Sequence, residues 1–446
     1  MFKKVLIANR GEIAVRIIRA CKEMGISTVA IYSDTDRDAM HVHMADQAIC
    51  IGGALSRDSY LNINAIITVA HRLEVDAIHP GYGYLSENVE FARKCKEYFI
   101  KFIGPSAEVI EKMGDKDVAR KTMKEIGVPV VPGTDVLPNK LEAIKQAKKI
   151  GFPLLIKAKS GGGGKGIRLV ERLQDFEHAY EQAEQEALKS FGDGGCYIEK
   201  FLSPVKHIEM QVLADEFDNI VVLGERECSV QRRNQKMIEE TPSLAVSKVL
   251  RPHMIKATRN VVKTVGYTNA GTIEYLLDSQ GHFYFMEMNT RLQVEHPVTE
   301  MTTGIDIVKW QIRIAMGLPL TFVQADVRSK GASIECRINA ENPKLGFRPS
   351  AGTITSINYP AGPWVRFDTS IYYGYTVPPY YDSMIGKLIV WANTREEAIN
   401  RLKVALCELG IEGIDTNVDM QLQILNHIKF KNGDYYTNFI ANEFDL

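Results

Sequence analysis

The 446-residue sequence lacks the features of several large classes of protein. No apolar run approaches the roughly 18 residues of a transmembrane helix, and the first ten residues turn polar too early for a secretory signal peptide. The 54 lysines and arginines almost balance 55 aspartates and glutamates, so the net charge of −1 gives no footprint for nucleic acid or a membrane surface. The seven cysteines include no Cys-x-x-Cys pair, which argues against a disulfide framework and a zinc site. These absences predict a cytoplasmic protein that binds neither nucleic acid nor membranes.

Short apolar runs alternate with amphipathic helices through about the first hundred residues, beginning with a strand at 5–7 and a helix at 12–24. This alternation predicts an open parallel sheet with helices on both faces. On the first helix Arg16 and Arg19 share one face, which is either a solvated edge or an oligomer contact. A long helix is predicted at 107–126, with Lys116 in its interior as an ordinary surface lysine.

A glycine-rich loop at 161–166 lies between two predicted strands, the first of which ends at Lys157. A dinucleotide fingerprint needs a helix after its glycines, and a Walker A loop needs Ser or Thr after Lys165, where this sequence has glycine. Two interpretations remain open. One is a mobile hairpin whose backbone N–H groups close over nucleotide phosphates, and the other is a flexible tip that binds nothing.

Two further stretches carry polar side chains in regular patterns. In the strand predicted at 206–213, His207, Glu209 and Gln211 share one face. Residues 231–236 then gather three cations and three amides, which form either an anion-binding wall or an exposed basic turn.

A β-hairpin predicted around a turn at 278–281 has a polar face that includes Glu287 and Asn289. The neighbouring strand sets Glu274 beside Glu287, and two such carboxylates repel each other unless a cation lies between them. Glu274, Glu287 and the amide oxygen of Asn289 therefore form a predicted Mg²⁺ site, with ordinary surface charge as the alternative. If the chain stays extended, three more residues share this face: Arg291, Gln293 and Glu295.

The last part of the chain changes character. One helix is predicted at 299–316, and from about residue 325 short β-like runs with Pro and Gly turns precede two helices at 394–409 and 417–428. This order predicts a smaller α+β closing domain.

Several motifs stand in the order and spacing of a known family. They occupy residues 7–13, 79–83, 113–116, Lys157 with 161–166, and residues 207–209, 231–233, 287–296, 335–341 and 380–387. Over nearly its whole length the sequence resembles the biotin carboxylases, the ATP-grasp components of acetyl-CoA and related carboxylases. The resemblance implies a multidomain α/β and α+β fold: an open parallel α/β domain (1–113), an ATP-grasp domain (114–325) with a mobile lid at about 131–203, and a small α+β C-terminal domain (326–446).

The resemblance also implies a reaction, in which ATP and bicarbonate form carboxyphosphate and the carboxyl group passes to the ureido nitrogen of biotin. The cofactor is Mg²⁺ or Mn²⁺, held by Glu274, Glu287 and Asn289. The residues implied to contact ATP are Lys116, Lys157, Gly163, Gly164, Glu199, Leu202, His207, Gln231, Asn234, Glu274 and Glu287.

By the same resemblance Glu295 is the general base, and Arg337 stabilises the biotin enolate beside Tyr82. The residues implied to bind bicarbonate are Lys236, Arg291, Gln293, Val294 and Glu295, so the catalytic set is Arg291, Glu295, Lys236 and Arg337. Asn234 stands where many members carry histidine, and Lys159 where a small residue is expected.

No Met-Lys-Met biotinylation site is present, so biotin is expected on a separate carrier protein, with carboxyltransferase subunits as further partners. The resemblance implies a homodimer with the Arg16/Arg19 face and Arg366 as contacts. Fatty acid synthesis from acetyl-CoA is the expected context, with another acyl-CoA or pyruvate as the alternative acceptor. Two other functions were weighed: a carbamoyl-phosphate-forming or peptide-bond-forming ligase of the same fold, and a nucleotide sensor, which would not need a base such as Glu295.

Overall fold

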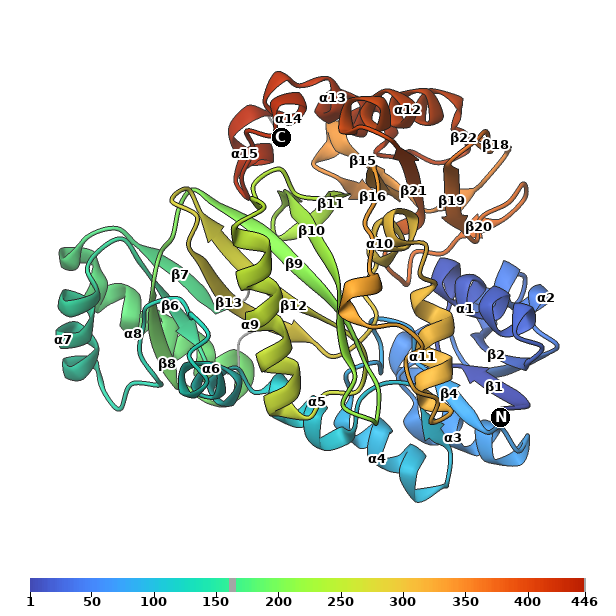
Figure 1. Ribbon diagram of the computed structural model, residues 1–446, viewed down its shortest axis with the longest axis horizontal. Helices are drawn as coiled ribbons and strands as arrows, with labels where there is room; N and C mark the ends of the chain where they lie inside the picture. The colour runs from blue at the N-terminus through green and yellow to red at the C-terminus, as the bar shows by residue number, and fades with distance from the viewer. Residues whose placement is uncertain (160–165, 445–446) are drawn as a thin grey trace.

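The computed structural model describes residues 1–159 and 166–444, so the glycine-rich loop, including Gly163 and Gly164, lies outside the described residues. Figure 1 shows an N-terminal unit, a central sheet with the C-terminal unit beside it, and an outer unit that projects to one side. None of the helices in the described ranges combines the length and apolar character that crossing a membrane requires.

The N-terminal unit contains the parallel sheet that the sequence predicts, in the strand order β3-β2-β1-β4-β5. Val5 and Ile7 pack with helix α1 on one face, and Leu6 packs with α3 and α4 on the other, so the strand is apolar at every buried position. The strands are β1 (Lys4–Ile7), β2 (Ser27–Ser33), β3 (Gln47–Gly52), β4 (Ala77–His79) and β5 (Lys101–Phe102), and the helices are α1 (Gly11–Glu23), α2 (Met40–Met44), α3 (Ile63–Arg72) and α4 (Val89–Glu97).

The single helix expected across 107–126 is wrong. Helix α5 (Ala107–Gly114) ends and α6 (Lys116–Glu125) begins at Asp115, whose carboxylate accepts hydrogen bonds from the backbone N–H groups of Asp117 and Val118. Aspartate caps a helix in this way because its oxygen satisfies amides that have no partner within the first turn. Lys116 is therefore the first residue of α6 and not an interior position.

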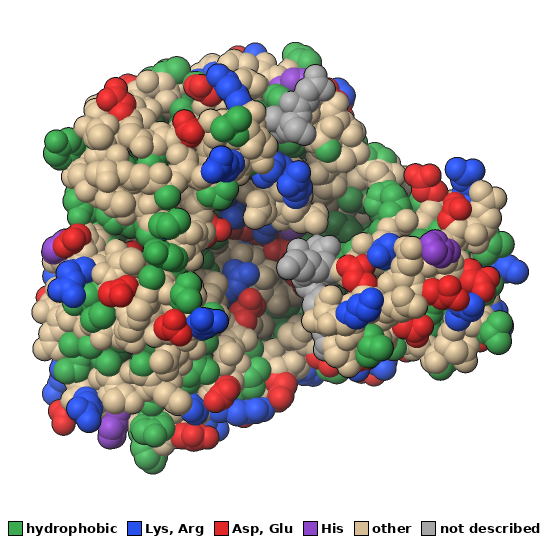
Figure 2. Space-filling model, turned by 180° about the vertical axis from the view of Figure 1, so that it is seen from behind, with side chains coloured by type: hydrophobic (Ala, Val, Ile, Leu, Met, Phe, Trp, Pro, Cys, Tyr) green, Lys and Arg blue, Asp and Glu red, His purple; other side chains and the backbone are tan. Residues whose placement is uncertain are grey.

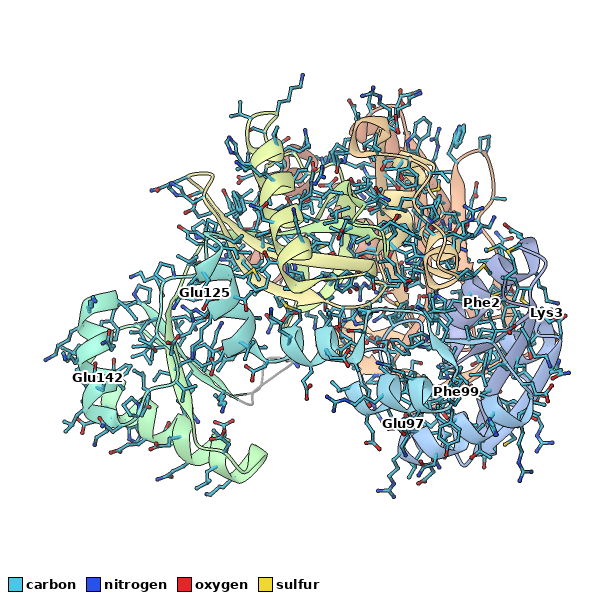
Figure 3. All side chains as sticks on the ribbon, turned by 60° about the horizontal axis from the view of Figure 1, so that its bottom comes forward. Phe2, Lys3, Glu97, Phe99, Glu125 and Glu142 are labelled. Carbon is cyan, nitrogen blue, oxygen red and sulfur yellow. The ribbon has the colours of Figure 1, made fainter. Side chains whose placement is uncertain are left out.

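The outer unit has its own three-stranded sheet, in the order β7-β6-β8, and its own hydrophobic core. Its elements are α7 (Lys140–Ile150), β6 (Leu154–Ala158), β7 (Ile167–Val170), α8 (Leu173–Phe191) and β8 (Cys196–Lys200). At its root, the Phe285 backbone N–H donates to the Pro129 carbonyl at 2.7 Å. Figure 3 shows Glu142 of α7 out on this unit, with Glu125 at the end of α6 nearer the body of the molecule.

The central sheet has eight strands in the order β13-β12-β9-β10-β11-β14-β21-β19. The last three come from the C-terminal part of the chain, so the predicted closing domain continues the central sheet instead of starting another large one. The strands are β9 (Val205–Ala214), β10 (Ile220–Arg232), β11 (Gln235–Thr241), β12 (Asn269–Asp278), β13 (Phe283–Asn289), β14 (Ala332–Asn339), β19 (Val365–Thr369) and β21 (Met384–Ala392).

The single helix predicted at 299–316 is also wrong, because α10 (His296–Thr303) ends at Gly304, whose φ of +71° is easily adopted by glycine, and α11 (Ile307–Ala315) starts anew. The remaining helices are α9 (Leu250–Val265), α12 (Arg395–Glu408), α13 (Val418–Asn426), α14 (Ile428–Asn432) and α15 (Phe439–Glu443). Six short strands complete the C-terminal unit: β15 (Glu341–Asn342), β16 (Arg348–Pro349), β17 (Gly352–Thr353), β18 (Ser356–Asn358), β20 (Thr376–Val377) and β22 (Gly410–Glu412).

Candidate active site

A row of charged side chains crosses the central sheet. Arg226 on β10 lies opposite Glu209 on β9, Glu209 lies opposite Glu274 on β12, and Glu274 lies opposite Glu287 on β13. Residues in register on neighbouring strands project on the same face with Cβ atoms about 5 Å apart. The register thus sets three carboxylates side by side, and cations are needed to hold them there.

Lys236 of β11 supplies the central cation. Its ammonium is bound by Glu209, lies 2.8 Å from a Glu295 oxygen and lies 3.1 Å from a Glu274 oxygen. All three carboxylates are buried. Burial alone would raise the pKa of Glu209 and Glu274. The charge of Lys236, together with His207, Arg226 and the other groups around them, more than offsets burial, so the pKa of Glu209 falls to about 2 and that of Glu274 well below its usual value.

Arg226 anchors the other end of the row, and its side chain is fully buried. Its guanidinium donates to Glu209 Oε2 at 3.0 Å and to Gln211 Oε1 at 2.7 Å. It also reaches the hydroxyl groups of Thr272 and Thr299. A buried arginine is stable only when its donors find partners in this way.

His207 of β9 contacts Glu274 of the charged row on one side and Gln231 of β10 on the other. Its Nε2 is 3.0 Å from Glu274 Oε2, and its Nδ1 is 2.9 Å from the Gln231 amide nitrogen. Burial would lower the pKa of His207, but the charge of Glu274 and the hydrogen bonds to Glu209 and Glu274 together raise it to about 9. His207 is thus an imidazolium at neutral pH, and it can interact with an anion above the sheet.

The segment after β13 does not stay extended, so Arg291, Gln293 and Glu295 do not continue the polar face of that strand. The strand ends at Asn289, and the chain loops before α10 begins at His296. Arg291 and Gln293 still reach the site. Arg291 donates to Gln293 Oε1 at 2.8 Å and to Asn289 Oδ1 at 3.0 Å, and Gln293 donates to Glu274 Oε1 at 3.1 Å.

Glu295 comes from this loop and is completely buried. Its two oxygens lie between two cations, with Lys236 Nζ at 2.8 Å and Arg337 Nη2 at 2.9 Å. Burial and the charge of Glu209 oppose ionisation, yet the surrounding cations lower the pKa of Glu295, which is therefore a carboxylate at neutral pH. The Val294 carbonyl beside it accepts a hydrogen bond from the Lys387 ammonium at 2.9 Å.

Arg337 of β14 is shared between two carboxylates. Its Nε donates to Glu239 Oε1 at 2.6 Å while its Nη2 contacts Glu295. Burial raises the pKa of Glu239 to about 7, although Arg337 opposes that change. Tyr82, expected near biotin, donates its hydroxyl proton to the Glu12 carboxylate.

The outer unit contributes a second charged group. Glu199 of β8 is bound by Lys157 of β6 and by Arg120 of α6, the latter at 2.7 Å. Leu202 follows β8 and is half-buried, and Lys116 is exposed at the start of α6. Asn234 lies at the exposed turn between β10 and β11, where its φ of +65° suits asparagine.

The predicted metal ligands have the donor chemistry of a magnesium site. Burial and then the nearby charge of Glu274 raise the pKa of Glu287, which is the repulsion expected of two carboxylates in register. Hard oxygen ligands of this kind suit Mg²⁺. The amide of Asn289 bridges Arg291 and Glu274, so its oxygen lies within this cluster.

Several residues of the site were missed from the sequence. Glu239 and Arg120 each bind a predicted site residue, Arg226 binds Glu209 of the charged row, and Glu87 accepts a hydrogen bond from Arg291 Nε at 2.8 Å. For Glu239 no local signal existed, since β11 is mostly polar and only Met237 and Ile238 in it are apolar. The others depend on strand and helix partners far away in the sequence.

The site opens onto a hollow in the surface. Figure 2 shows this hollow on the face opposite to that of Figure 1, between the projecting outer unit and the body of the molecule, with lysine or arginine and acidic side chains on its walls. A polyanion can enter such a space and meet side chains of both signs.

The chain matches three protein-family models that follow one another along it. They are "Biotin carboxylase, N-terminal domain" (residues 1–110), "Carbamoyl-phosphate synthase L chain, ATP binding domain" (115–323) and "Biotin carboxylase C-terminal domain" (335–442). Their order agrees with the three parts expected from the motifs.

Relatives and solved structures agree with these matches. Biotin carboxylase 1 of Bacillus subtilis is 53% identical over 442 residues, which cover 99% of this chain and 98% of the relative. The 2-oxoglutarate carboxylase small subunit of Hydrogenobacter thermophilus is 51% identical, with 99% and 93% covered. The Campylobacter jejuni biotin carboxylase structure has a TM-score of 0.96 at 50% identity, with 99% of each chain covered. Over its whole length, therefore, the chain belongs to the biotin carboxylase family of ATP-dependent ligases.

Proposed function

We propose that this protein carboxylates biotin on a separate carrier protein, using ATP and bicarbonate to form carboxyphosphate first. The observation that carries the proposal is Glu295, an ionised buried carboxylate held between the cations of Lys236 and Arg337. Solved relatives support the choice of substrates, since one contains MgADP, ADP and bicarbonate and another an ATP analogue.

In this mechanism Glu295 takes the proton of bicarbonate, and Lys236 and Arg291 bind the resulting anion. Cations placed in advance around a developing charge stabilise the transition state without further reorganisation. Once Glu295 is protonated it attracts Arg337 less, so Arg337 keeps its contact with Glu239 and can turn its other donors to the biotin enolate. Tyr82 lines the biotin side of the same space.

ATP would lie between the outer unit and the central sheet. Lys116, Lys157 and His207 bring positive charge to its phosphates, while Glu199, Leu202, Gln231 and Asn234 border the nucleotide; Gly163 and Gly164 complete the proposed set. Glu274, Glu287 and Asn289 would hold Mg²⁺ or Mn²⁺, which would neutralise phosphate charge when bound.

The test is the cleavage of ATP by the purified protein. We expect cleavage to depend on bicarbonate and to increase with free biotin. Equal ATP cleavage with and without bicarbonate and biotin would overturn the proposal, and stimulation by ammonia or an amino acid would instead favour another ligase of this fold.

We further propose that the protein is a cytoplasmic homodimer that works with a biotin carrier and carboxyltransferase subunits in acetyl-CoA carboxylation. A solved relative is a dimer, and others are named subunits of 2-oxoglutarate and pyruvate carboxylases, which are the competing contexts. Arg16 and Arg366 both bind Glu300, at 2.9 Å and 2.7 Å, so the proposed contact face is already ordered within one chain. Identification of the biotinylated protein that co-purifies with this chain would decide the acceptor.

A further inference from the structure

A buried lysine joins three distant parts of the chain. Lys387 of β21 is 0% exposed, and its ammonium lies 2.9 Å from the Val294 carbonyl and 3.1 Å from Glu12 Oε1. Removing an ammonium from water is costly unless the charge is paired and hydrogen-bonded. These two contacts therefore determine where the ammonium can lie.

Each partner of Lys387 is linked to a residue proposed to act on a substrate: Val294 to Glu295, on the bicarbonate side, and Glu12 to Tyr82, on the biotin side. Val294 immediately precedes Glu295, the proposed base. Glu12, from the start of α1, accepts the hydroxyl proton of Tyr82 on the same oxygen that faces Lys387. The Lys387 ammonium also lies 5.8 Å from the centre of the Tyr82 ring.

We propose that Lys387 and Glu12 are positioning residues that fix the bicarbonate loop and the biotin-side Tyr82 relative to each other. The idea rests on the proposed function above and assigns a role to two sequence motifs, at 7–13 and 380–387, that the reaction itself does not use. Lys387 holds the Val294 carbonyl and thereby the direction in which the Glu295 side chain leaves the loop. Glu12 binds both the Lys387 ammonium and the Tyr82 hydroxyl, and so fixes the position of Tyr82 relative to Lys387.

The pair does more than fill space. Replacing a whole buried ion pair with apolar side chains of similar volume is often neutral or stabilising, so stability alone does not explain the pair. A side chain that only packs would also not require the directed contacts to a carbonyl and a tyrosine hydroxyl. Each contact joins two separate parts of the chain. Packing alone would allow these parts to shift slightly relative to each other.

The experiment measures kcat and KM for bicarbonate and for free biotin in Lys387→Met, Lys387→Arg and Glu12→Gln. Lys206→Met is the matched control, because Lys206 is also a buried lysine that donates to backbone carbonyls, those of Tyr435 and Gly433. Thermal unfolding of each variant is followed in parallel.

We expect Lys387→Met to lower kcat for bicarbonate-dependent ATP cleavage by about 10- to 100-fold, since small misplacements of a reacting group have effects of this size. Glu12→Gln should raise KM for biotin about fivefold, the effect of weakening one hydrogen bond, and should lower kcat less than Lys387→Met does. Lys387→Arg, which keeps the charge, should restore part of the lost kcat. Lys206→Met should unfold at a lower temperature with KM values unchanged.

The inference fails if Lys387→Met and Glu12→Gln lose thermal stability as Lys206→Met does while kcat and both KM values stay within twofold of wild type. If Lys387→Met does not fold, an unchanged KM for biotin in Glu12→Gln alone overturns it. The proposed function fails in a different way, through a wild-type protein that shows no response to bicarbonate or biotin.

Discussion

The N-terminal sheet and the central sheet both bury their strands, but they fill the interior differently. In β1 the successive residues Val5, Leu6 and Ile7 are all apolar, because helices cover both faces of that parallel sheet. Every residue of β9 is buried as well, yet from His207 to Val212 polar and apolar side chains alternate. Burial in the central sheet therefore does not imply an apolar side chain, provided that neighbouring strands bring opposite charges into register.

The two sheets differ in how their interiors respond to change. In an apolar interior, a small truncation removes a little contact area and costs little stability. In an interior with buried charges, a single substitution can remove the partner that stabilises a charge, and the cost is larger. The eight-stranded sheet thus holds its charged groups in a network in which each charge is stabilised by a neighbour of opposite sign. The experiments below test this difference, beginning with the largest expected effect.

Glu295→Gln should lower bicarbonate-dependent ATP cleavage by about 10²- to 10⁴-fold, because glutamine has nearly the same shape but cannot accept the proton. Steady-state kinetics checks this. The matched control is Glu225→Gln, which alters another buried carboxylate, paired with Arg251 at 2.6 Å outside the charged row. Equal losses in the two variants would mean that Glu295, like Glu225, matters only for folding.

Arg226→Met should lower the free energy of unfolding by about 3–5 kcal/mol, because it leaves the buried charge of Glu209 with fewer partners. Urea unfolding measures the loss. The double variant Arg226→Met with Glu209→Leu should recover part of it, since no unpaired carboxylate remains. A cost below about 1 kcal/mol for the single variant would show that the row is better solvated than its burial indicates.

The difference in stability between wild type and His207→Gln should depend on pH in a defined direction. The folded pKa of about 9 exceeds the ordinary value of about 6.5, so protonated His207 contributes fully below pH 6.5, by about 3 kcal/mol, and its contribution is lost as the pH rises through 9. Urea unfolding of wild type and variant at pH 6.5 and pH 9.5 should therefore show a gap that narrows at the higher pH. A gap of constant size contradicts the assignment.

Ile7→Val in the N-terminal sheet should cost only about 1 kcal/mol, the usual effect of removing one buried methylene group. Its kinetic constants should stay close to those of wild type, because Ile7 lies in an apolar cluster with α1 and is not part of the charged row. Urea unfolding and steady-state kinetics check both points. A larger loss of activity than of stability would mean that this sheet also orients the site.

Local sequence patterns predicted the helices and strands better than they predicted which of them lie side by side. The parallel order of the first sheet follows from alternating strands and helices, and the bounds of α1 and α12 agree with the predicted ones within one residue, because each depends on residues close in the chain. The breaks at Asp115 and Gly304 were missed because the apolar spacing continues across both, while one capping side chain and one left-handed glycine end the helices.

The position of Glu287 and Asn289 in one strand followed from alternation along the sequence, whereas the other residues of the proposed site were named by the family resemblance. The facing of Glu274 and Glu287 agrees with the expected hairpin. Arg226 and Glu239 were not predictable from local sequence, because their roles depend on which strands lie beside β9 and β14. The continuation of the central sheet into the C-terminal strands was missed for the same reason, since about ninety residues separate β11 from β14 along the chain.

The pairing of β11 with β14 makes the C-terminal part of the chain inseparable from the charged row. Glu239 lies opposite Glu335 across that seam, and Arg337 reaches over it to Glu295. A fragment cut near residue 325 would leave β11 as an open edge with unpaired backbone groups, which invites association with other chains. What looks like a removable closing module thus supplies one side of the proposed site, so the two parts should be expressed and redesigned together.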